Sequence, residues 1–169
     1  MKKQLSILHI TEVASGGVLP MIANICNGLA DEHHIIVAYG IRPDTPANIR
    51  AYFDDRIILI TVSFFKREIS IKDDIKVMKV INSIVKIYHP DIVHMHSTKA
   101  GLLGRIALLS YQGRKFYTPH GYSFLRKDDP KFKIVLYKIV EFLLAHTGCI
   151  TAACGGGEWK YATSGFPAI

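Results

Sequence analysis

Two adjacent glycines, Gly16 and Gly17, stand where a short apolar run gives way to a segment with helical periodicity. Glycine lets the backbone approach a ligand closely, and the first turn of a helix presents unpaired N–H groups, so this turn suits an anion such as a diphosphate. Glycines here can equally serve the turn alone, because glycine punctuates loops in most proteins. The pair is a candidate anion site that needs support from other segments.

A second polar group follows the apolar run 92–95, where His96, Ser97 and Lys99 precede another helical segment. Residues two apart in a strand share a face, so His94 and His96 lie together in the manner of two metal ligands. No Asp, Glu or Cys stands nearby as a third ligand, so we expect no metal and interpret His94 as a hydrogen-bonded core residue. His96 and Lys99 are candidates for contact with a phosphate or a sugar hydroxyl.

The third candidate is His120, which stands between Pro119 and Gly121 just after another apolar run. A rigid proline before it and a permissive glycine after it hold the imidazole at the end of a strand while the backbone bends around a ligand. A purely structural histidine is the alternative, because histidines are often partly buried.

The elements that position these residues form an alternating pattern. Expected strands cover residues 5–10, 35–39, 57–62, 92–95, 115–118 and 149–153, and helical periodicity follows at 18–29, 71–88, about 99–110 and about 131–146. Alternation of this kind is typical of βαβ units, and uniformly apolar strands indicate helices on both faces. We predict one α/β domain with a doubly wound, mostly parallel, Rossmann-like sheet.

Such a sheet brings distant loops together. The carboxyl ends of strands near the switch point share one crevice, so we expect Gly16, Gly17, His96 and His120 to face a single cavity. Two nucleotide-binding classes are disfavoured, since the first turn lacks both G-x-G-x-x-G and the phosphate-loop pattern, and residues 38–41 offer no carboxylate for a ribose. Neither nicotinamide nor ATP chemistry is supported.

Composition narrows the class further. A length of 169 residues is near the size at which one hydrophobic core is filled, so one domain is expected. The three cysteines include no CxxC pair, which favours a reducing compartment over disulfides or zinc. No apolar run reaches the roughly 20 residues of a membrane-spanning helix. The formal charge is +7, and residues 114–138 hold seven basic against two acidic side chains.

This basic segment attracts an anionic membrane surface, a phosphorylated ligand or nucleic acid without distinguishing among them. A solvated helix face is the plain alternative. We expect no nucleic-acid partner, because no helix combines regular Arg and Lys spacing with an aromatic platform or a known motif.

Three pieces in this order resemble the N-terminal half of the glycosyltransferase family four enzymes, particularly bacterial capsular and surface-polysaccharide transferases. They are "GGV" at 16–18, "PDIVHMHSTKAGLLGRIAL" at 90–108 and "YTPHGYSF" at 117–124, and "GEWKYATSGFP" resembles the end of that half. One departure is Gly155–Gly156, where relatives more often carry a serine or another polar residue. The resemblance implies that residues 1–169 are the acceptor-side domain of a two-domain GT-B enzyme whose donor-binding C-terminal domain is absent here. The fragment alone is then expected to be inactive.

Carried over residue by residue, the resemblance implies that Gly16 and Gly17 lie beneath the donor diphosphate. His120 would be the catalytic residue bordering the donor sugar, with His96, Ser97 and Lys99 lining the donor cleft. The residues implied on the acceptor side are Tyr122, Ser123, Arg126 and Lys127.

The implied reaction transfers a sugar from a nucleotide diphosphate sugar to an acceptor hydroxyl with retention of configuration. Its oxocarbenium-like transition state lies beside a departing diphosphate, which N–H groups and cations can stabilise, so no cofactor or metal is expected. The sequence also contains no D-x-D metal motif.

The expected acceptor is a saccharide, and a polyprenyl-diphosphate-linked one would suit the basic and apolar segment 114–145. That segment could dock on the cytoplasmic leaflet, which predicts a cytoplasmic protein at the inner face of the plasma membrane. The alternative is a binding or regulatory module that holds a sugar nucleotide or phosphosugar without turnover. A second Rossmann-like half with an E-x7-E pair beyond Ile169 would favour the enzyme.

Overall fold

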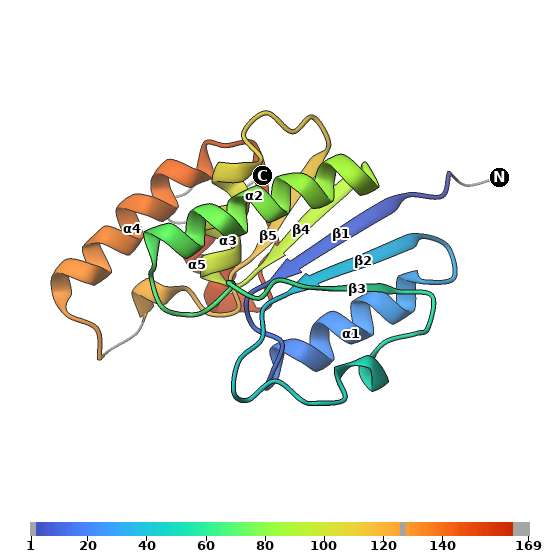
Figure 1. Ribbon diagram of the computed structural model, residues 1–169. Coiled ribbons are helices and arrows are strands. Elements are labelled where there is room, and N and C mark those ends of the chain that lie inside the picture. The colour runs from blue at the N-terminus through green and yellow to red at the C-terminus, as the bar shows by residue number, and fades with distance from the viewer. Residues whose placement is uncertain (1–2, 126–127, 164–169) are drawn as a thin grey trace.

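Six parallel strands form one sheet in the order β3-β2-β1-β4-β5-β6 (Figure 1). The computed structural model describes residues 3–125 and 128–163. The strands are β1 (Ser6–Thr11), β2 (His34–Tyr39), β3 (Ile58–Thr61), β4 (Ile92–His96), β5 (Arg114–Thr118) and β6 (Cys149–Thr151). The strand order reverses between β1 and β4, which makes the carboxyl edge beside them the expected ligand-binding edge. The predicted parallel, doubly wound sheet is confirmed.

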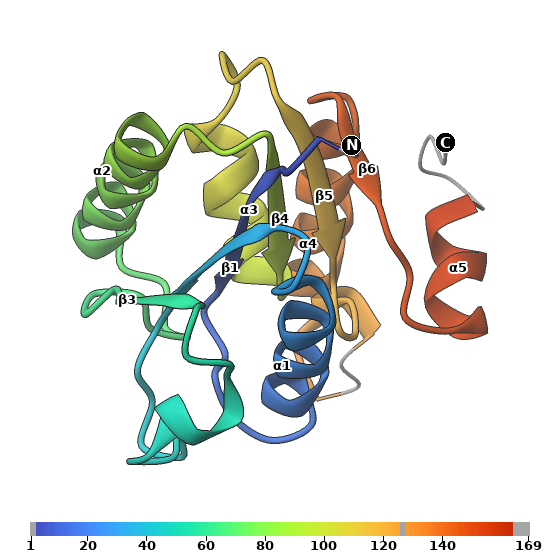
Figure 2. The ribbon, with the colours of Figure 1, turned by 90° about the vertical axis from the view of Figure 1, so that its right-hand side faces the viewer.

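Helices cover both faces of the sheet (Figure 2). They are α1 (Val18–Leu29), α2 (Ile71–Tyr88), α3 (Thr98–Ala107), α4 (Lys131–Ala145) and α5 (Gly156–Thr163), with 3-10 turns η1 (Ile49–Tyr52) and η2 (Ser123–Leu125). Leu8 and Ile10 of β1 pack with α2 and α3, whereas Ile7 packs with α1. Neighbouring residues of β1 thus enter opposite layers of the core, which is why the strand is apolar on both faces. The short α5 and the 3-10 turns have too few residues to show a helical period in the sequence.

The start of α2 is fixed by reciprocal capping. The Ser70 side chain accepts a hydrogen bond from the Asp73 backbone N–H at 3.4 Å, and Asp74 accepts one from the Ser70 N–H at 3.3 Å. The helix ends at Tyr88, and its C-cap His89 has a left-handed φ of 43° and precedes a proline. Capping therefore holds Asp74 at the end of the helix that lies nearest the carboxyl edge of the sheet.

A buried charge network ties α3, α4 and β5 together. Arg105 and Glu141 form a 2.7 Å ion pair, and the Tyr117 hydroxyl donates to the other Glu141 oxygen at 2.9 Å. Arg105 also donates from Nε to the Gly101 carbonyl at 2.8 Å, and its guanidinium lies 4.2 Å from the Tyr117 ring centroid. Because a charge stripped of water is costly unless paired, this network strongly constrains where α4 sits on α3.

Candidate functional site

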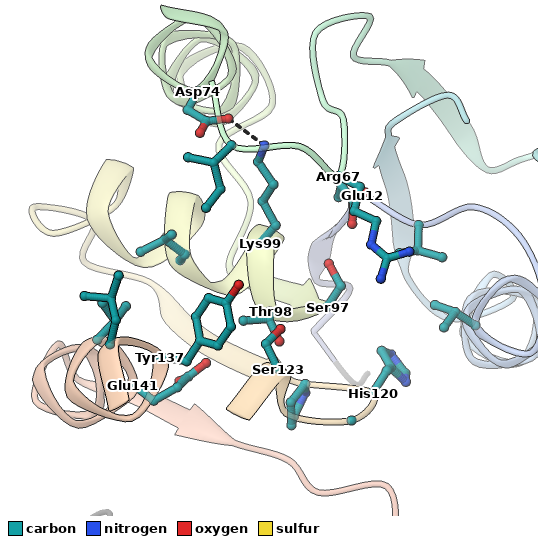
Figure 3. Close-up of a pocket in the computed structure, with 18 of the residues that line it drawn as sticks. Glu12, Arg67, Asp74, Ser97, Thr98, Lys99, His120, Ser123, Tyr137 and Glu141 are labelled. Atoms are coloured by element: carbon teal, nitrogen blue, oxygen red, sulfur yellow. Dashed lines mark ion pairs between the residues drawn. The ribbon is translucent and has the colours of Figure 1, made fainter. Parts of the chain in front are cut away.

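A cavity of about 390 Å³ opens at the carboxyl edge of the sheet (Figure 3). Each strand from β1 to β5 contributes the segment that follows it, and α4 forms a further wall. Among the residues that line it are Glu12, Val13, Val18, Arg42, Arg67, Ile69, Asp74, Ser97, Lys99, His120, Ser123, Leu136, Tyr137 and Glu141. The loops after β1, β4 and β5 therefore do meet at one cavity, but of the four residues expected to face it only His120 is part of its wall. We refer to it below as the cleft.

The glycine pair lies between Val13 and Val18, which both line the cleft, although the glycines themselves are not part of its wall. Gly16 has a left-handed φ of 54°, which a residue without a Cβ adopts without strain. Gly17 is the N-cap of α1 and supplies no side-chain cap. The Leu19 N–H donates to the Ser15 carbonyl at 3.3 Å and Pro20 has no N–H, so within the first turn of α1 the Val18 N–H is the donor left to a partner beside the cleft.

Ser97 and Lys99 line the cleft. Ser97 has a φ of 81° and caps α3 by accepting from the Ala100 N–H at 3.4 Å. Lys99 pairs with Asp74 at 2.8 Å and also donates to the carbonyl of Glu68 (Figure 3). The lysine is therefore held by the start of α2 rather than extended freely into the cleft.

Two arginines and a glutamate in the wall were not singled out from the sequence. Arg42 binds Glu12 through Nε at 2.8 Å and Nη2 at 2.7 Å, and burial raises the pKa of Glu12 against the opposing effect of Arg42. Arg67 is the one cation in the described wall that forms no ion pair with a described carboxylate. All three residues lie in segments that follow β1, β2 or β3. That position after a strand was the sequence signal that could have identified them as site residues.

A chain of hydrogen-bonded imidazoles leads from the core to the cleft. His9 Nδ1 lies 3.0 Å from His96 Nε2, His96 Nδ1 lies 3.1 Å from His120 Nε2, and His120 Nδ1 lies 3.5 Å from Cys154 Sγ. Burial lowers the pKa of His9 to about 3 and holds the pKa of His96 well below its usual range. The pKa of His120 is also lowered by burial. These rings are neutral near pH 7 and serve as hydrogen-bonding groups, not as cations.

Besides Gly16 and Gly17, two further predicted site residues do not line the cleft. His96 has no exposed surface and lies behind His120, so its predicted contact with ligand is corrected to a contact with His120. Tyr122 is 4% exposed and stacks on Phe124, because η2 turns its ring into the core. Ser123, the next residue, does line the cleft. The predicted acceptor-side residues Arg126 and Lys127 lie outside the described residues.

His94 is hydrogen-bonded, as predicted, with Nε2 2.9 Å from the Thr118 hydroxyl. The pairing of β1 with β4 sets His9 opposite His94, and ligand atoms of His9, His94 and His96 lie within 4.8 Å of one another. These three could in principle hold a metal ion. However, both nitrogens of His96 and one of His94 are already hydrogen-bonded. Only a parallel register between distant strands could have identified His9 as the third ring.

The turn that carries His120 is tied to α5. Both His120 and Gly121 have left-handed φ values, 51° and 91°. Glu158, in the first turn of α5, accepts hydrogen bonds from the backbone N–H groups of Gly121 and, at 2.9 Å, of Cys154. A carboxylate at this point satisfies two backbone donors and holds the turn in a conformation that side chains rarely adopt.

A family model described as "Glycosyl transferase 4-like" matches residues 6–153. The chain belongs to this family. The resemblance to the glycosyltransferase family four enzymes is thereby confirmed.

The glycosyl transferase 4-like chain is 36% identical over 95 residues to an Escherichia coli enzyme named UDP-Gal:alpha-D-GlcNAc-diphosphoundecaprenol alpha-1,3-galactosyltransferase, covering 56% of this chain and 24% of that protein. It is 28% identical over 155 residues to a 41.2 kDa protein in the cps region of Klebsiella pneumoniae, covering 88% of this chain and 40% of that protein. The chain thus spans less than half the length of these relatives.

Among solved structures, sucrose-phosphate synthase from Thermosynechococcus elongatus has a TM-score of 0.70 at 12% identity, covering 93% of this chain and 44% of that one. UDP-N-acetylglucosamine 2-epimerase from Rickettsia bellii has a TM-score of 0.63 at 14% identity, covering 98% and 43%. At such identities the likeness establishes the fold, and the glycosyl transferase 4-like domain has the fold of one half of these two larger chains.

Proposed function

We propose that this chain is the N-terminal domain of a retaining glycosyltransferase of surface-polysaccharide synthesis. The enzyme would move a sugar from a nucleotide diphosphate sugar to a hydroxyl of a lipid-linked saccharide acceptor at the cytoplasmic face of the plasma membrane. The observation that carries the proposal is the convergence on one cleft of Val18 at the start of α1, Lys99 and His120. The named activity of the E. coli relative, which pairs UDP-Gal with a diphosphoundecaprenol-linked sugar, supports this choice of substrates.

On the donor side, the turn at Gly16 and Gly17 offers the backbone N–H of Val18, the first residue of α1, to the diphosphate. Charge builds up on that diphosphate as its bond to the anomeric carbon breaks, and fixed donors that face the developing charge lower the barrier. Arg67 is placed to add a cation from the β3–α2 loop. The proposed stabilisation therefore comes from a backbone N–H and cations, with no metal ion and no cofactor.

His120 is proposed to border the donor sugar. Its two nitrogens face His96 and Cys154, so a hydrogen bond to the sugar requires the ring to release one of these partners. Sulfur is a weak acceptor and lies 3.5 Å away, which makes the bond to Cys154 the easier one to exchange. We therefore assign the sugar contact to Nδ1 of a neutral imidazole.

The acceptor is proposed to enter between His120 and α4. Ser123 supplies a hydroxyl there, and Leu136, Tyr137 and Val140 supply an apolar wall with a phenol group. Sugar rings present both hydroxyls and apolar C–H faces, so such a mixed wall suits a saccharide. Because the transfer is retaining, the acceptor oxygen would bond to the same face of the donor sugar that the diphosphate leaves.

The test is an assay of the full protein product of the gene with labelled UDP-sugars and a GlcNAc-diphosphate-lipid acceptor. We expect transfer by the wild type and by His34→Ala, a control at an exposed strand start, and a large loss in His120→Ala. Activity should persist in EDTA, and the product linkage should keep the anomeric configuration of the donor. Tight nucleotide-sugar binding without transfer to any acceptor would instead support a binding module, and full activity of His120→Ala would remove His120 from its role.

A further inference from the structure

The outer face of α4 is a continuous apolar stripe. Its residues fall at positions i, i+3, i+4, i+7, i+10 and i+11, so they share one side of the helix, and each is 49–69% exposed. They are Phe132, Val135, Leu136, Ile139, Phe142 and Leu143. The opposite side of α4 is already used, since Leu144 and Glu141 are buried and Tyr137 packs against the core. The helix therefore has one apolar side that the described residues leave uncovered.

A second apolar group stands across the cleft from this stripe. Ile69 is 78% exposed and Ile71 is 77% exposed, in the connection from β3 to α2. Ile69 and Leu136 both line the cleft, so the two apolar groups flank its opening. Large exposed apolar patches mark sites of interaction, and these two share one entrance. We call the α4 stripe together with Ile69 and Ile71 the docking face.

Lysines accompany both parts of the docking face. Lys131, Lys133 and Lys138 lie on α4, and Lys66 and Lys72 flank the two isoleucines. None of these five forms an ion pair with a carboxylate in the part of the chain that the structure describes. Lysine is depleted in protein–protein interfaces, whereas apolar side chains with flanking lysines are typical of helices that lie on anionic lipid. The charges therefore favour a lipid surface over a second protein as the occupant.

We propose that the docking face binds the surface of an anionic bilayer, so that a lipid-linked acceptor reaches the cleft from the plane of the membrane. The apolar stripe would enter the boundary between headgroups and acyl chains, while the lysines would reach lipid phosphates. The 15 residues of α4 span about 22 Å, enough for a helix that lies on the surface. No helix within residues 3–125 and 128–163 is long and apolar enough to cross a bilayer. The delivery of a lipid-linked acceptor to the cleft rests on the proposed function, but binding of the docking face to lipid can be measured without turnover.

The test is co-sedimentation of the full protein product of the gene with vesicles of phosphatidylcholine alone or mixed with phosphatidylglycerol. We expect binding to the mixed vesicles that high salt weakens, and an at least tenfold loss of binding in the double variant Ile139→Ser, Leu143→Ser. The matched control is Ile87→Ser, Leu109→Ser, which changes two apolar residues that are at least as exposed on average and do not line the cleft. Lys131→Glu, Lys133→Glu should lose binding to mixed vesicles, and Lys79→Glu, Lys86→Glu should not.

Equal sedimentation of the wild type with both kinds of vesicle would overturn the proposal. A dimer that forms without lipid and dissociates in the double variant Ile139→Ser, Leu143→Ser would also overturn it, because a second copy would then cover the stripe. Far-ultraviolet circular dichroism and thermal melting establish that the variants fold.

An activity assay with two acceptors distinguishes a loss of membrane docking from a loss of the proposed reaction. The stripe variant should transfer sugar to a short-chain, water-soluble acceptor as the wild type does, and fail with an acceptor embedded in vesicles. If the wild type uses neither acceptor, the proposed function fails, while the vesicle result still decides the docking face.

Discussion

Nδ1 of His96 lies 3.1 Å from Nε2 of His120, so a fully buried imidazole stands directly behind the one that borders the cleft. His9 extends the chain on the other side of His96, and its Nε2 is buried without a partner among the described residues. A buried N–H without an acceptor is rarer than a buried lone pair without a donor. We therefore infer that each ring carries its proton on Nδ1 and donates towards the cleft, so that His96 presents an N–H to His120.

Replacing His96 tests this positioning role. We expect His96→Leu to lower the kcat of the full enzyme on the order of 100-fold with little change in KM for the donor, since a misplaced catalytic group impairs the chemical step. His96→Asn keeps an N–H near the position of Nδ1 and should retain most of the activity. Cys154→Ala should be close to wild type, because the sugar is proposed to replace that partner. Equal losses in His96→Leu and His96→Asn would contradict a specific hydrogen-bonding role.

Part of this site could be predicted from the sequence. Strand and helix patterns placed Gly16, Ser97, Lys99 and His120 at one edge, because the carboxyl ends of parallel strands share an edge whatever the loops between them do. His9 was missed because alternation within β1 reveals its face but not its neighbour. The pairing of His9 with His94 joins residues that are far apart in the chain.

The sequence pattern also could not predict that α4 forms a wall of the cleft. Periodicity gave its apolar sides but not its direction across the sheet, which depends on the pairing of Glu141 with Arg105. Tyr122 was misplaced for a related reason. The 3-10 turn η2 rotates it into the core while Ser123 stays at the cleft, and a turn of three residues leaves no periodic trace.

The buried histidines predict acid sensitivity. The pKa of His9 is lowered to about 3 and that of His94 to about 4, mainly by burial, and that of His96 is lowered as well. Above the usual histidine pKa of about 6.5 neither the folded nor the unfolded state binds the protons, so no stability is lost there. As the pH falls below that value, these histidines bind protons in the unfolded state but not in the folded state. Each such histidine then costs about 1.4 kcal/mol of stability per pH unit until its own folded pKa is reached.

Urea unfolding at a series of pH values between about 7.5 and 5 measures this slope. The lowered pKa values of Asp73 and Asp91 act at lower pH, so the histidines should dominate this window. His94→Gln should flatten the slope, whereas His34→Gln at an exposed site should leave it unchanged. A stability that does not vary between pH 7 and pH 5 would show that the rings can ionise in the folded state.

The ion pair between Arg105 and Glu141 predicts strong coupling in a double-mutant cycle. Glu141→Leu leaves a buried guanidinium and the Tyr117 hydroxyl without their acceptor, which should cost about 3–5 kcal/mol of unfolding free energy. Arg105→Met should cost a similar amount by stranding the carboxylate. The double variant removes both charges and should recover much of either loss. Additive losses measured by chemical denaturation would mean that the two groups do not act as a pair.

Gly101 lets α3 pack closely against β5. A Cβ on Gly101 would overlap the ring of Tyr117, which is 1% exposed and held by Glu141, so the ring has no room to withdraw. Although alanine favours a helix over glycine by about 1 kcal/mol, Gly101→Ala should destabilise the chain by about 1–3 kcal/mol. Gly28→Ala in α1 is the matched control, because its Cβ would meet nothing within 4 Å and the change should be neutral or stabilising.

Gly101→Ala also tests the site, because Ser97, the N-cap of α3, and Lys99, in its first turn, both line the cleft. If α3 moves outward to accommodate the methyl group, nucleotide-sugar affinity should fall in Gly101→Ala and remain unchanged in Gly28→Ala. Calorimetric titration of both variants with UDP-sugar measures this. A Gly101→Ala protein as stable as the wild type would show that α3 does not pack against β5 as closely as its contact with Tyr117 requires.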